Sequence, residues 1–245
     1  MRQKQKHFFY GWVVVAITAL TLLVSGGVRA APGVFLLPLR ADVGWSRASI
    51  SFAVSLGPVL FGLAGPLSGW LMDRFGPRWL MFGGMLLVAS SMALSATMTS
   101  VWQLNLFWGA LSGIGTGVAS TVLGAAVANR WFVARRGVVT RIFGAATSAG
   151  QLVFVWVLIR LVEQQGWRTS SMLLAGVAAA IALPIALFMR NDPADIGQRP
   201  LGVAATAAIP QRSSAEPSIM RRALRTASSG CFQAPSSSAA QPRTA

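Results

Sequence analysis

Arg29 and Gln151 are the residues whose types and surroundings most suggest binding chemistry. Arg29 lies deep inside the first long apolar run of the chain. A charge at the centre of a membrane costs at least about 2.5 kcal/mol unless it faces a polar cavity or reaches the surface. Arg29 is therefore either a site for an anionic substrate or a side chain that extends to the headgroups. Gln151 lies midway along another apolar run. Its amide predicts a hydrogen bond, either to a substrate or to a neighbouring helix.

A second group of charges lies in the stretch "GWLMDRFGPR", residues 69–78. It places one acid, two bases and a proline between two apolar runs. A soluble domain would not place such long apolar runs on both sides of so short a charged stretch. Chain turns that leave a membrane do carry such charges. The spaced residues of this pattern are Gly69, Asp73, Arg74, Gly76 and Arg78.

The residue types needed for catalysis and for metal binding are scarce. His7 is the only histidine and Cys231 the only cysteine, and no acid lies within the apolar runs. We therefore expect no catalytic residue, no metal site, no cofactor and no enzymatic activity. The net charge of +15 does not indicate a nucleic-acid partner, because the basic residues lie between apolar runs or in the tail.

The composition predicts a membrane protein that positions these residues on helices. Hydrophobic residues make up 54% of the 245 residues and charged residues 11%, whereas soluble domains are about 25% charged. Runs of about 18 or more apolar residues are long enough to cross a bilayer as helices. We therefore predict an all-α transmembrane bundle, with the lipid bilayer as partner. Its six expected spans are, approximately, residues 10–37, 49–71, 80–98, 103–128, 138–162 and 171–189.

Basic residues and glycines refine this bundle. Arginine and lysine concentrate on one side of the spans, which predicts that both termini are cytoplasmic and that the first span is not a cleaved signal peptide. In the fourth span Gly109, Gly113 and Gly117 recur every four residues. Small residues at that spacing let helices pack closely in lipid. A role in helix sliding during transport is the alternative.

Three regions follow from these features. Residues 1–9 form a basic cytoplasmic head, residues 10–190 the transmembrane domain, and residues 191–245 a cytoplasmic tail. The tail is rich in Pro, Ala and Ser and is too poor in apolar residues to fold alone.

The residue 69–78 pattern resembles the signature between the second and third helices of the major facilitator superfamily, Gly-x-x-x-Asp-Arg-x-Gly-x-Arg. The stretches "FYGWVVVA", "WFVARRG", "SAGQLVF" and "GWR" resemble its monocarboxylate and oxalate/formate porter branch. The resemblance covers about residues 8–200, the amino-terminal six-helix half of a twelve-helix carrier. It implies that residues 69–78 act as a conformational switch. In that family the acid caps a helix of the opposite half, and the arginines pair with acids to latch the outward-open state. A carboxylate is stabilised at a helix N-terminus, which suits Asp73.

The chain also departs from the family pattern. Gly109 occupies the place of the arginine that proton antiporters carry, and the fifth helix lacks their Gly-Pro pair. A first-helix lysine matters for the substrate in the monocarboxylate branch. Ala30 falls at that place, with Arg29 one position away.

The resemblance implies a secondary transporter of small organic anions, working by alternating access in a bacterial inner membrane. The partners are a small-molecule substrate and either a missing C-terminal half or a second copy in a homodimer. The tail, from about residue 226, is expected to be a frameshifted start of that second half. The alternative function is a non-transporting membrane fragment or interaction module.

Overall fold

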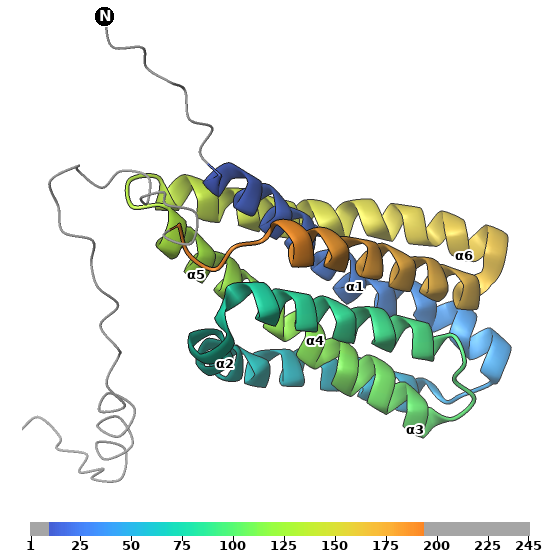
Figure 1. The fold of residues 1–245 in the computed structure, drawn as a ribbon. Coiled ribbons are helices and arrows are strands. Elements are labelled where there is room, and N and C mark those ends of the chain that lie inside the picture. The colour runs from blue at the N-terminus through green and yellow to red at the C-terminus, as the bar shows by residue number, and fades with distance from the viewer. Residues whose placement is uncertain (1–9, 194–245) are drawn as a thin grey trace, which may run out of the picture. The chain divides into compact units, whose positions relative to one another are not determined.

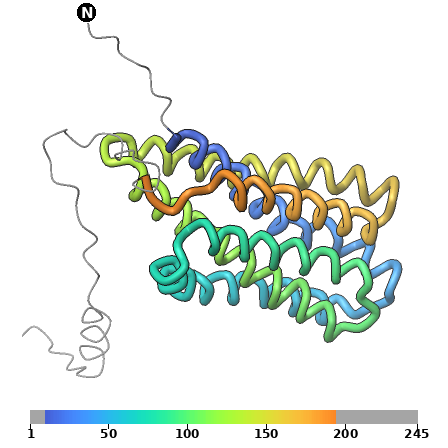
Figure 2. The backbone as a smooth tube through the Cα atoms, in the orientation of Figure 1, coloured from blue at the N-terminus to red at the C-terminus, as the bar shows by residue number. Residues whose placement is uncertain are grey.

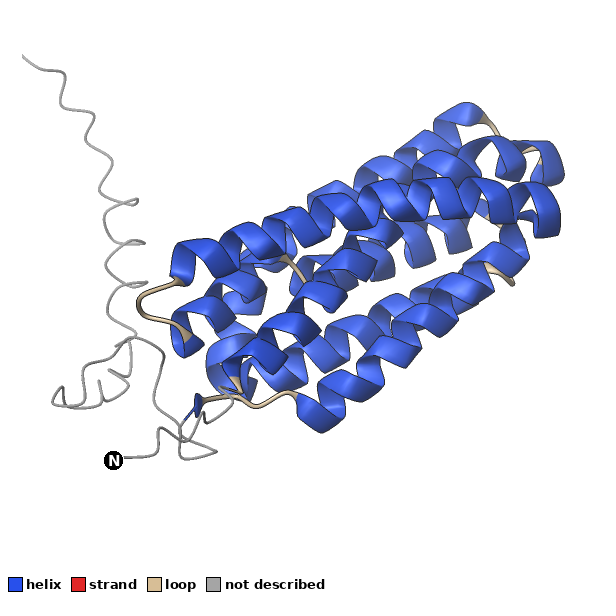
Figure 3. Cartoon of the chain, turned by 90° about the horizontal axis from the view of Figure 1, so that it is seen from above, coloured by secondary structure: helices blue, strands red, loops and turns tan. Residues whose placement is uncertain are grey.

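The computed structural model describes residues 10–193 (Figure 1). The expected basic head, residues 1–9, lies outside the described residues. So does the tail from residue 194 onward, including the segment after about residue 226. Within residues 10–193 every regular element is a helix, and no β-strand element occurs (Figure 3). The all-helical prediction is therefore confirmed.

The helices follow one another with short connections. In chain order they are α1 Gly11–Val43, α2 Arg47–Ser95, α3 Val101–Leu104, the π-helix η1 Asn105–Leu111, α4 Ser112–Val118, α5 Thr121–Trp131 and α6 Arg136–Phe188. Four helical stretches are long and apolar enough to cross a membrane. These are α1, α2, the run Val101–Trp131, and α6.

Two of these stretches, α2 and α6, each contain two helical segments. A straight helix of 49 residues, the length of α2, would be about 74 Å long, more than twice the ~30 Å hydrocarbon core. Gly76 interrupts α2 with φ 80° and ψ 163°, and Gly166 interrupts α6 with φ 78° and ψ 167°. At each interruption the chain turns back along itself, as the yellow and orange parts of α6 show (Figures 1 and 2).

The fourth predicted span, residues 103–128, is not one continuous α-helix. A seven-residue π-helix, η1, replaces α-helix at Asn105–Leu111. The Phe107 carbonyl accepts the Ser112 N–H, five residues on, and also the Ser91 hydroxyl at 2.7 Å. The second donor stabilises the wider turn. A further break at Ala119 and Ser120 separates α4 from α5. The predicted span 103–128 thus falls within the helical run Val101–Trp131, which is interrupted within it.

The core of the bundle lies around α1. This helix packs mainly against α6, while α2 packs mainly against η1, α4 and α6. The side chains of Val14, Val28, Phe35 and Leu39 on α1 are fully buried. Large apolar side chains elsewhere are exposed, for example Leu152 at 75% and Trp102 at 73%. An outer surface of this kind suits a lipid environment.

The two ends of the described segment meet at one end of the bundle. The Tyr10 hydroxyl donates a hydrogen bond to the Phe188 carbonyl at 2.5 Å. The same end holds the Gly76 turn and the connection between α5 and α6 (Figure 1). We call this the Gly76 end. The connections that follow α1 and α2, and the turn at Gly166, lie at the opposite end (Figures 1 and 2).

Candidate functional site

A cavity of about 220 Å³ opens between α1, α2, the continuous run of η1 and α4, and α6. Its wall includes Arg29 from α1, Phe61 from α2, Trp108 from η1 and Gln151 from α6. Ser112, Gly113 and Thr116 of α4 complete one side. The two residues singled out from the sequence for substrate binding, Arg29 and Gln151, thus line the same cavity although they are far apart in the chain. Their binding roles remain predictions.

The Arg29 side chain is exposed and has an aromatic neighbour. Its guanidinium carbon lies 4.3 Å from the centroid of the Phe61 ring. Among the described residues, no carboxylate lies within 4.0 Å of the Arg29 nitrogens. The acids of the three ion pairs found in residues 10–193 contact Arg130 and Arg168 instead. Cation–π contact leaves guanidinium N–H groups available, so Arg29 can donate hydrogen bonds to an anion in the cavity.

Trp108 adds a neutral donor to the cavity wall. The residue is 4% exposed and its ring lies 5.4 Å from that of Phe35, tilted by 32°. Its indole Nε1 is buried and has no hydrogen-bond partner within the described part of the chain. Unsatisfied buried donors are uncommon in native proteins and often mark a functional place. Nothing in the local sequence distinguishes this residue, because tryptophan is common in membrane proteins.

The glycines of the fourth span lie where α2 approaches most closely. A Cβ atom added at Gly113 would be 2.7 Å from the Gly57 carbonyl oxygen. Added at Gly117 it would be 2.6 Å from Ala64 Cβ, and at Gly109 2.8 Å from Leu56 Cδ2. Real Cβ atoms essentially never show separations below 3.0 Å, so a neighbour would have to move; backbone atoms, as at Gly113, yield less readily than the end of a side chain, as at Gly109. These distances are the geometry expected of packing glycines, and their packing role remains a prediction.

At the Gly76 end, the turn of the residue 69–78 pattern rests on the end of α6. Gly76 has a positive φ, and a Cβ there would lie 2.7 Å from Asn191 Oδ1. The same oxygen accepts the Arg78 backbone N–H at 3.1 Å, and Arg78 Nη2 donates to the Ala186 carbonyl. The glycine is therefore required both by the backbone conformation and by the space that Asn191 occupies.

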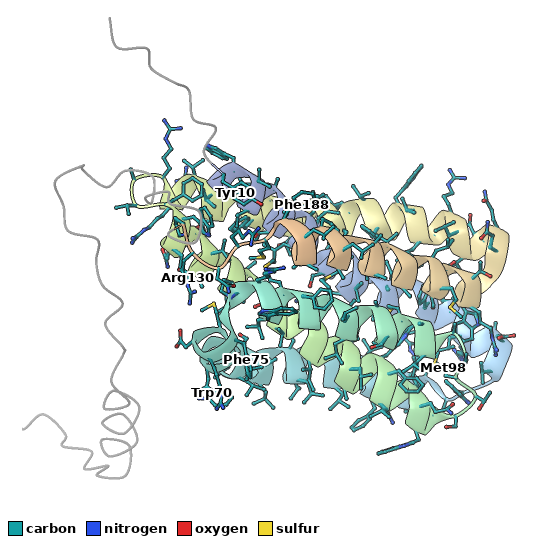
Figure 4. All side chains as sticks on the ribbon, viewed as in Figure 1. Tyr10, Trp70, Phe75, Met98, Arg130 and Phe188 are labelled. Atoms are coloured by element: carbon teal, nitrogen blue, oxygen red, sulfur yellow. The ribbon has the colours of Figure 1, made fainter. Side chains whose placement is uncertain are left out.

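Arg130 connects the acids of this region. Its guanidinium lies 4.0 Å from Asp73 Oδ1 and 3.8 Å from Asp192 Oδ1. The Arg130 side chain is 18% exposed, whereas that of Asp73 is 76% exposed. Figure 4 shows Arg130 at the same end of the bundle as Tyr10. The sequence did not identify Arg130, Asn191 or Asp192 as site residues. Arg78 and Asn191 are 113 residues apart, and no local sequence pattern predicts a contact over that separation.

The remaining two residues of the pattern have looser surroundings. Arg74 is exposed, with its guanidinium carbon 5.8 Å from the ring centroids of both Trp70 and Phe75. A Cβ at Gly69 would meet no atom within 4 Å. Neither residue therefore takes part in the contacts that join the turn to α6. The switch role of the whole pattern remains a prediction.

The opposite end of the bundle has its own polar contact. Asp42, in the last turn of α1, accepts a hydrogen bond from Trp167 Nε1 at 3.1 Å. The same carboxylate oxygen lies 3.8 Å from Arg168 Nη2. These residues tie the end of α1 to the turn of α6 at Gly166. Polar contacts thus join α6 to earlier helices at both ends of the bundle.

Comparison with known proteins connects this architecture to a family. The family model described as Major Facilitator Superfamily matches residues 18–237. The chain is 26% identical to the uncharacterized MFS-type transporter YcxA of Bacillus subtilis over 182 residues, covering 74% of this chain and 45% of the relative. It is 26% identical to the oxalate:formate antiporter of Oxalobacter formigenes over 182 residues, 73% of this chain and 42% of the relative.

A mammalian relative shows a similar match. Monocarboxylate transporter 13 of Bos taurus is 27% identical over 188 residues, 75% of this chain and 44% of the relative. The chain therefore spans less than half the length of each of these relatives. The family model covers most of the chain, including the cavity and the Gly76 turn. The chain is an integral membrane protein of the major facilitator superfamily.

Proposed function

We propose that the chain forms the N-terminal half of a secondary transporter that carries small organic anions. The observation that carries this proposal is the Arg29 guanidinium, exposed in a cavity and without a described carboxylate partner. A cation in that position favours an anionic ligand. Gln151 in the same wall adds an amide that can hydrogen-bond the ligand's oxygens. The names of two relatives, an oxalate:formate antiporter and a monocarboxylate transporter, agree with this substrate class.

The proposed topology has six spans. The segments before and after Gly76 and Gly166 each count as one span, together with α1 and the run Val101–Trp131. The Gly76 end faces the cytoplasm, which the arginines at positions 74, 78, 130, 135, 136 and 190 support through the positive-inside bias. Both termini are then cytoplasmic. The membrane proposed is a bacterial inner membrane.

Alternating access in this fold requires two halves that rock about a central site. The described bundle supplies one wall of the cavity. A second six-helix unit closes it, either from a longer chain or from another copy of this one. The residue 69–78 turn is then the switch, because Asp73 is 76% exposed and its carboxylate is available to a helix of that second unit.

Binding and flux of labelled anions test this function. The purified chain is assayed with ¹⁴C-labelled oxalate, formate and acetate, in detergent for binding and in liposomes for counterflow. Arg29→Gln should weaken binding at least tenfold, because the anion loses its charged donor, and Arg29→Lys should keep part of it. Arg160→Gln is the matched control. Arg160 is also an exposed arginine on an aromatic ring, 5.7 Å from the centroid of Trp156, but it does not line the cavity.

The two readouts separate the alternatives. Equal binding by Arg29→Gln and Arg160→Gln would contradict the assigned role of Arg29. Saturable binding without flux would contradict transport by this chain as it stands. That result would favour a non-transporting membrane protein, or one that needs a partner to move its ligand.

A further inference from the structure

The break between α4 and α5 lies against a second, much smaller cavity. α4 ends at Val118 and α5 begins at Thr121, with Ser120 as its N-cap residue. The cavity has a volume of about 20 Å³. Polar side chains from α1, α4, α5 and α6 and from the break itself line it: Ser25, Arg29, Thr116, Ser120, Thr121 and Thr147. A hydroxyl-rich pocket of this kind is unusual inside an otherwise apolar bundle.

The N-terminus of α5 points its unpaired backbone donors at this break. α5 has 11 residues, and its first intrahelical bond from the cap runs from the Gly124 N–H to the Ser120 carbonyl at 3.2 Å. Within the described residues no hydrogen-bond acceptor is found for the N–H groups of Thr121, Val122 and Leu123. Such groups, with the helix dipole, create a region of partial positive charge that favours anions. Discontinuous membrane helices of other transporters use the same device.

Ser120 supplies an independent sign that a ligand is expected here. The residue is 6% exposed, and its hydroxyl oxygen is buried without a hydrogen-bond partner among the described residues. A serine at this position commonly caps the helix, yet the Ser120 side chain makes no capping bond to α5. A buried unsatisfied hydroxyl destabilises the fold. Its presence in the wall of a cavity is explained if a ligand atom accepts a hydrogen bond from it.

Arg29 connects this small cavity to the larger one. It lines both the 20 Å³ and the 220 Å³ cavities. A volume of 20 Å³ holds about one water-sized atom, which is too small for a whole organic anion and suitable for a single carboxylate oxygen. The carbonyl groups that end α4 meet the same break and disfavour an anion, and the Arg29 charge offsets them.

We propose that the α4–α5 break is a carboxylate subsite. One carboxylate oxygen of the substrate occupies the small cavity, where the Ser120 hydroxyl and the N-terminal N–H groups of α5 donate to it. The other oxygen binds Arg29, and the remainder of the substrate lies in the larger cavity between Trp108 and Gln151. This inference rests on the proposed function and adds the orientation of the substrate, with its carboxylate toward α5.

Ser120→Ala in the full chain tests the subsite. Binding of ¹⁴C-labelled oxalate, formate and acetate is measured in detergent together with the melting temperature. We expect affinity for the anion that binds best to fall about tenfold while the melting temperature rises, because the variant removes an unsatisfied hydroxyl. Ser95→Ala is the matched control. Ser95 is also buried, but its hydroxyl donates to the Met92 carbonyl at 2.7 Å. That variant should melt at a lower temperature and bind normally.

The outcomes distinguish the subsite from the proposed function. If Ser120→Ala binds within twofold of the unaltered chain while Arg29→Gln loses binding, the subsite is overturned and the proposed function stands. If the unaltered chain binds none of the three anions, both are overturned.

A second measurement is made on the unaltered chain, so it does not rely on comparing the affinities of variants. The Thr121 amide resonance of a ¹⁵N-threonine-labelled sample, assigned with Thr121→Ser, should shift on titration with the same anion. A Thr121 resonance that stays unmoved at saturation overturns the subsite.

Discussion

At the scale of single residues, the arginines of the described bundle differ in what neutralises them. Arg130 lies within 4.0 Å of Asp73 and Asp192, and Arg168 lies 3.8 Å from Asp42. Arg29 contacts only the face of an aromatic ring among the interactions found for it in residues 10–193. Its charge is thus the one best placed to meet a ligand in the cavity. This contrast supports a structural role for Arg130 and Arg168 and a binding role for Arg29.

Glycine packing gives a prediction at this scale. Gly113→Ala should destabilise the chain by about 1–3 kcal/mol, because the new methyl group would overlap backbone atoms of Gly57 that cannot move aside. Gly62→Ala is the control, since a Cβ there meets no atom within 4 Å. It should be neutral or stabilise the helix by up to about 1 kcal/mol. Thermal unfolding in detergent, followed by circular dichroism, measures both. Equal melting temperatures for the two variants would contradict the packing role.

The sequence could point to Arg29 but not to Trp108 or Ser120. An arginine inside an apolar run is costly and therefore conspicuous. Tryptophan and serine are ordinary in membrane helices. What distinguishes Trp108 and Ser120 is a polar atom left without a partner after the helices pack, and packing partners far along the chain are not visible in a single sequence.

At the scale of elements, two glycine turns reverse the chain in nearly the same conformation but in different surroundings. Gly76 and Gly166 have φ values of 80° and 78°, with ψ near 165° in both. This region is almost exclusive to glycine. Gly76 also lies against Asn191, whereas a Cβ at Gly166 meets no atom within 4 Å. The residue type at position 76 is therefore restricted both by a neighbouring side chain and by backbone conformation, whereas at position 166 it is restricted by backbone conformation alone.

This difference leads to a prediction. Alanine at either glycine should cost about 1–3 kcal/mol of backbone strain, and Gly76→Ala should cost more because of the overlap with Asn191. Combining Asn191→Ala with Gly76→Ala should restore part of the additional stability that Gly76→Ala loses through this overlap. Chemical or thermal unfolding of the three variants in detergent gives the comparison. A Gly166→Ala variant less stable than Gly76→Ala would show that the Asn191 contact is unimportant.

The turns were easier to predict than the helix break. The charged residues and the proline in "GWLMDRFGPR" predict the turn at Gly76. Nothing comparable marks the end of α4, because "TGVASTVLG", residues 116–124, contains no proline and no charge. The π-helix η1 was also not predicted, since its additional hydrogen bond comes from Ser91 on another helix.

At the scale of the whole molecule, the described bundle has one end rich in arginine and one end with few. Ala134 lies in the connection between α5 and α6 at the Gly76 end, and Ala41 lies in the last turn of α1 at the other end. Both side chains are exposed. Cysteine at either position would therefore be a small, accessible change, and the two positions would report on opposite ends of the bundle.

Sided labelling tests the proposed topology. Single cysteines replace Ala134 and Ala41 in a Cys231→Ser background, and intact cells receive a membrane-impermeant maleimide. Cysteine at position 41 should react in intact cells, and cysteine at position 134 only after the membrane is permeabilised. The reverse pattern would invert the proposed orientation. Reaction of both in intact cells would contradict an end-to-end crossing.

The hydrogen bond between Tyr10 and Phe188 has a consequence for how such bundles can be joined. A 2.5 Å hydrogen bond holds Tyr10, the residue before α1, beside Phe188, the last residue of α6. The chain therefore leaves α6 close to the place where α1 begins. Two such units can therefore be fused in tandem through a short linker on one side, with no added crossing and with the same orientation. Gene duplication and fusion would thus yield a pseudosymmetric protein without inverting either repeat, which is the relation seen between parallel repeats in this class of transporter.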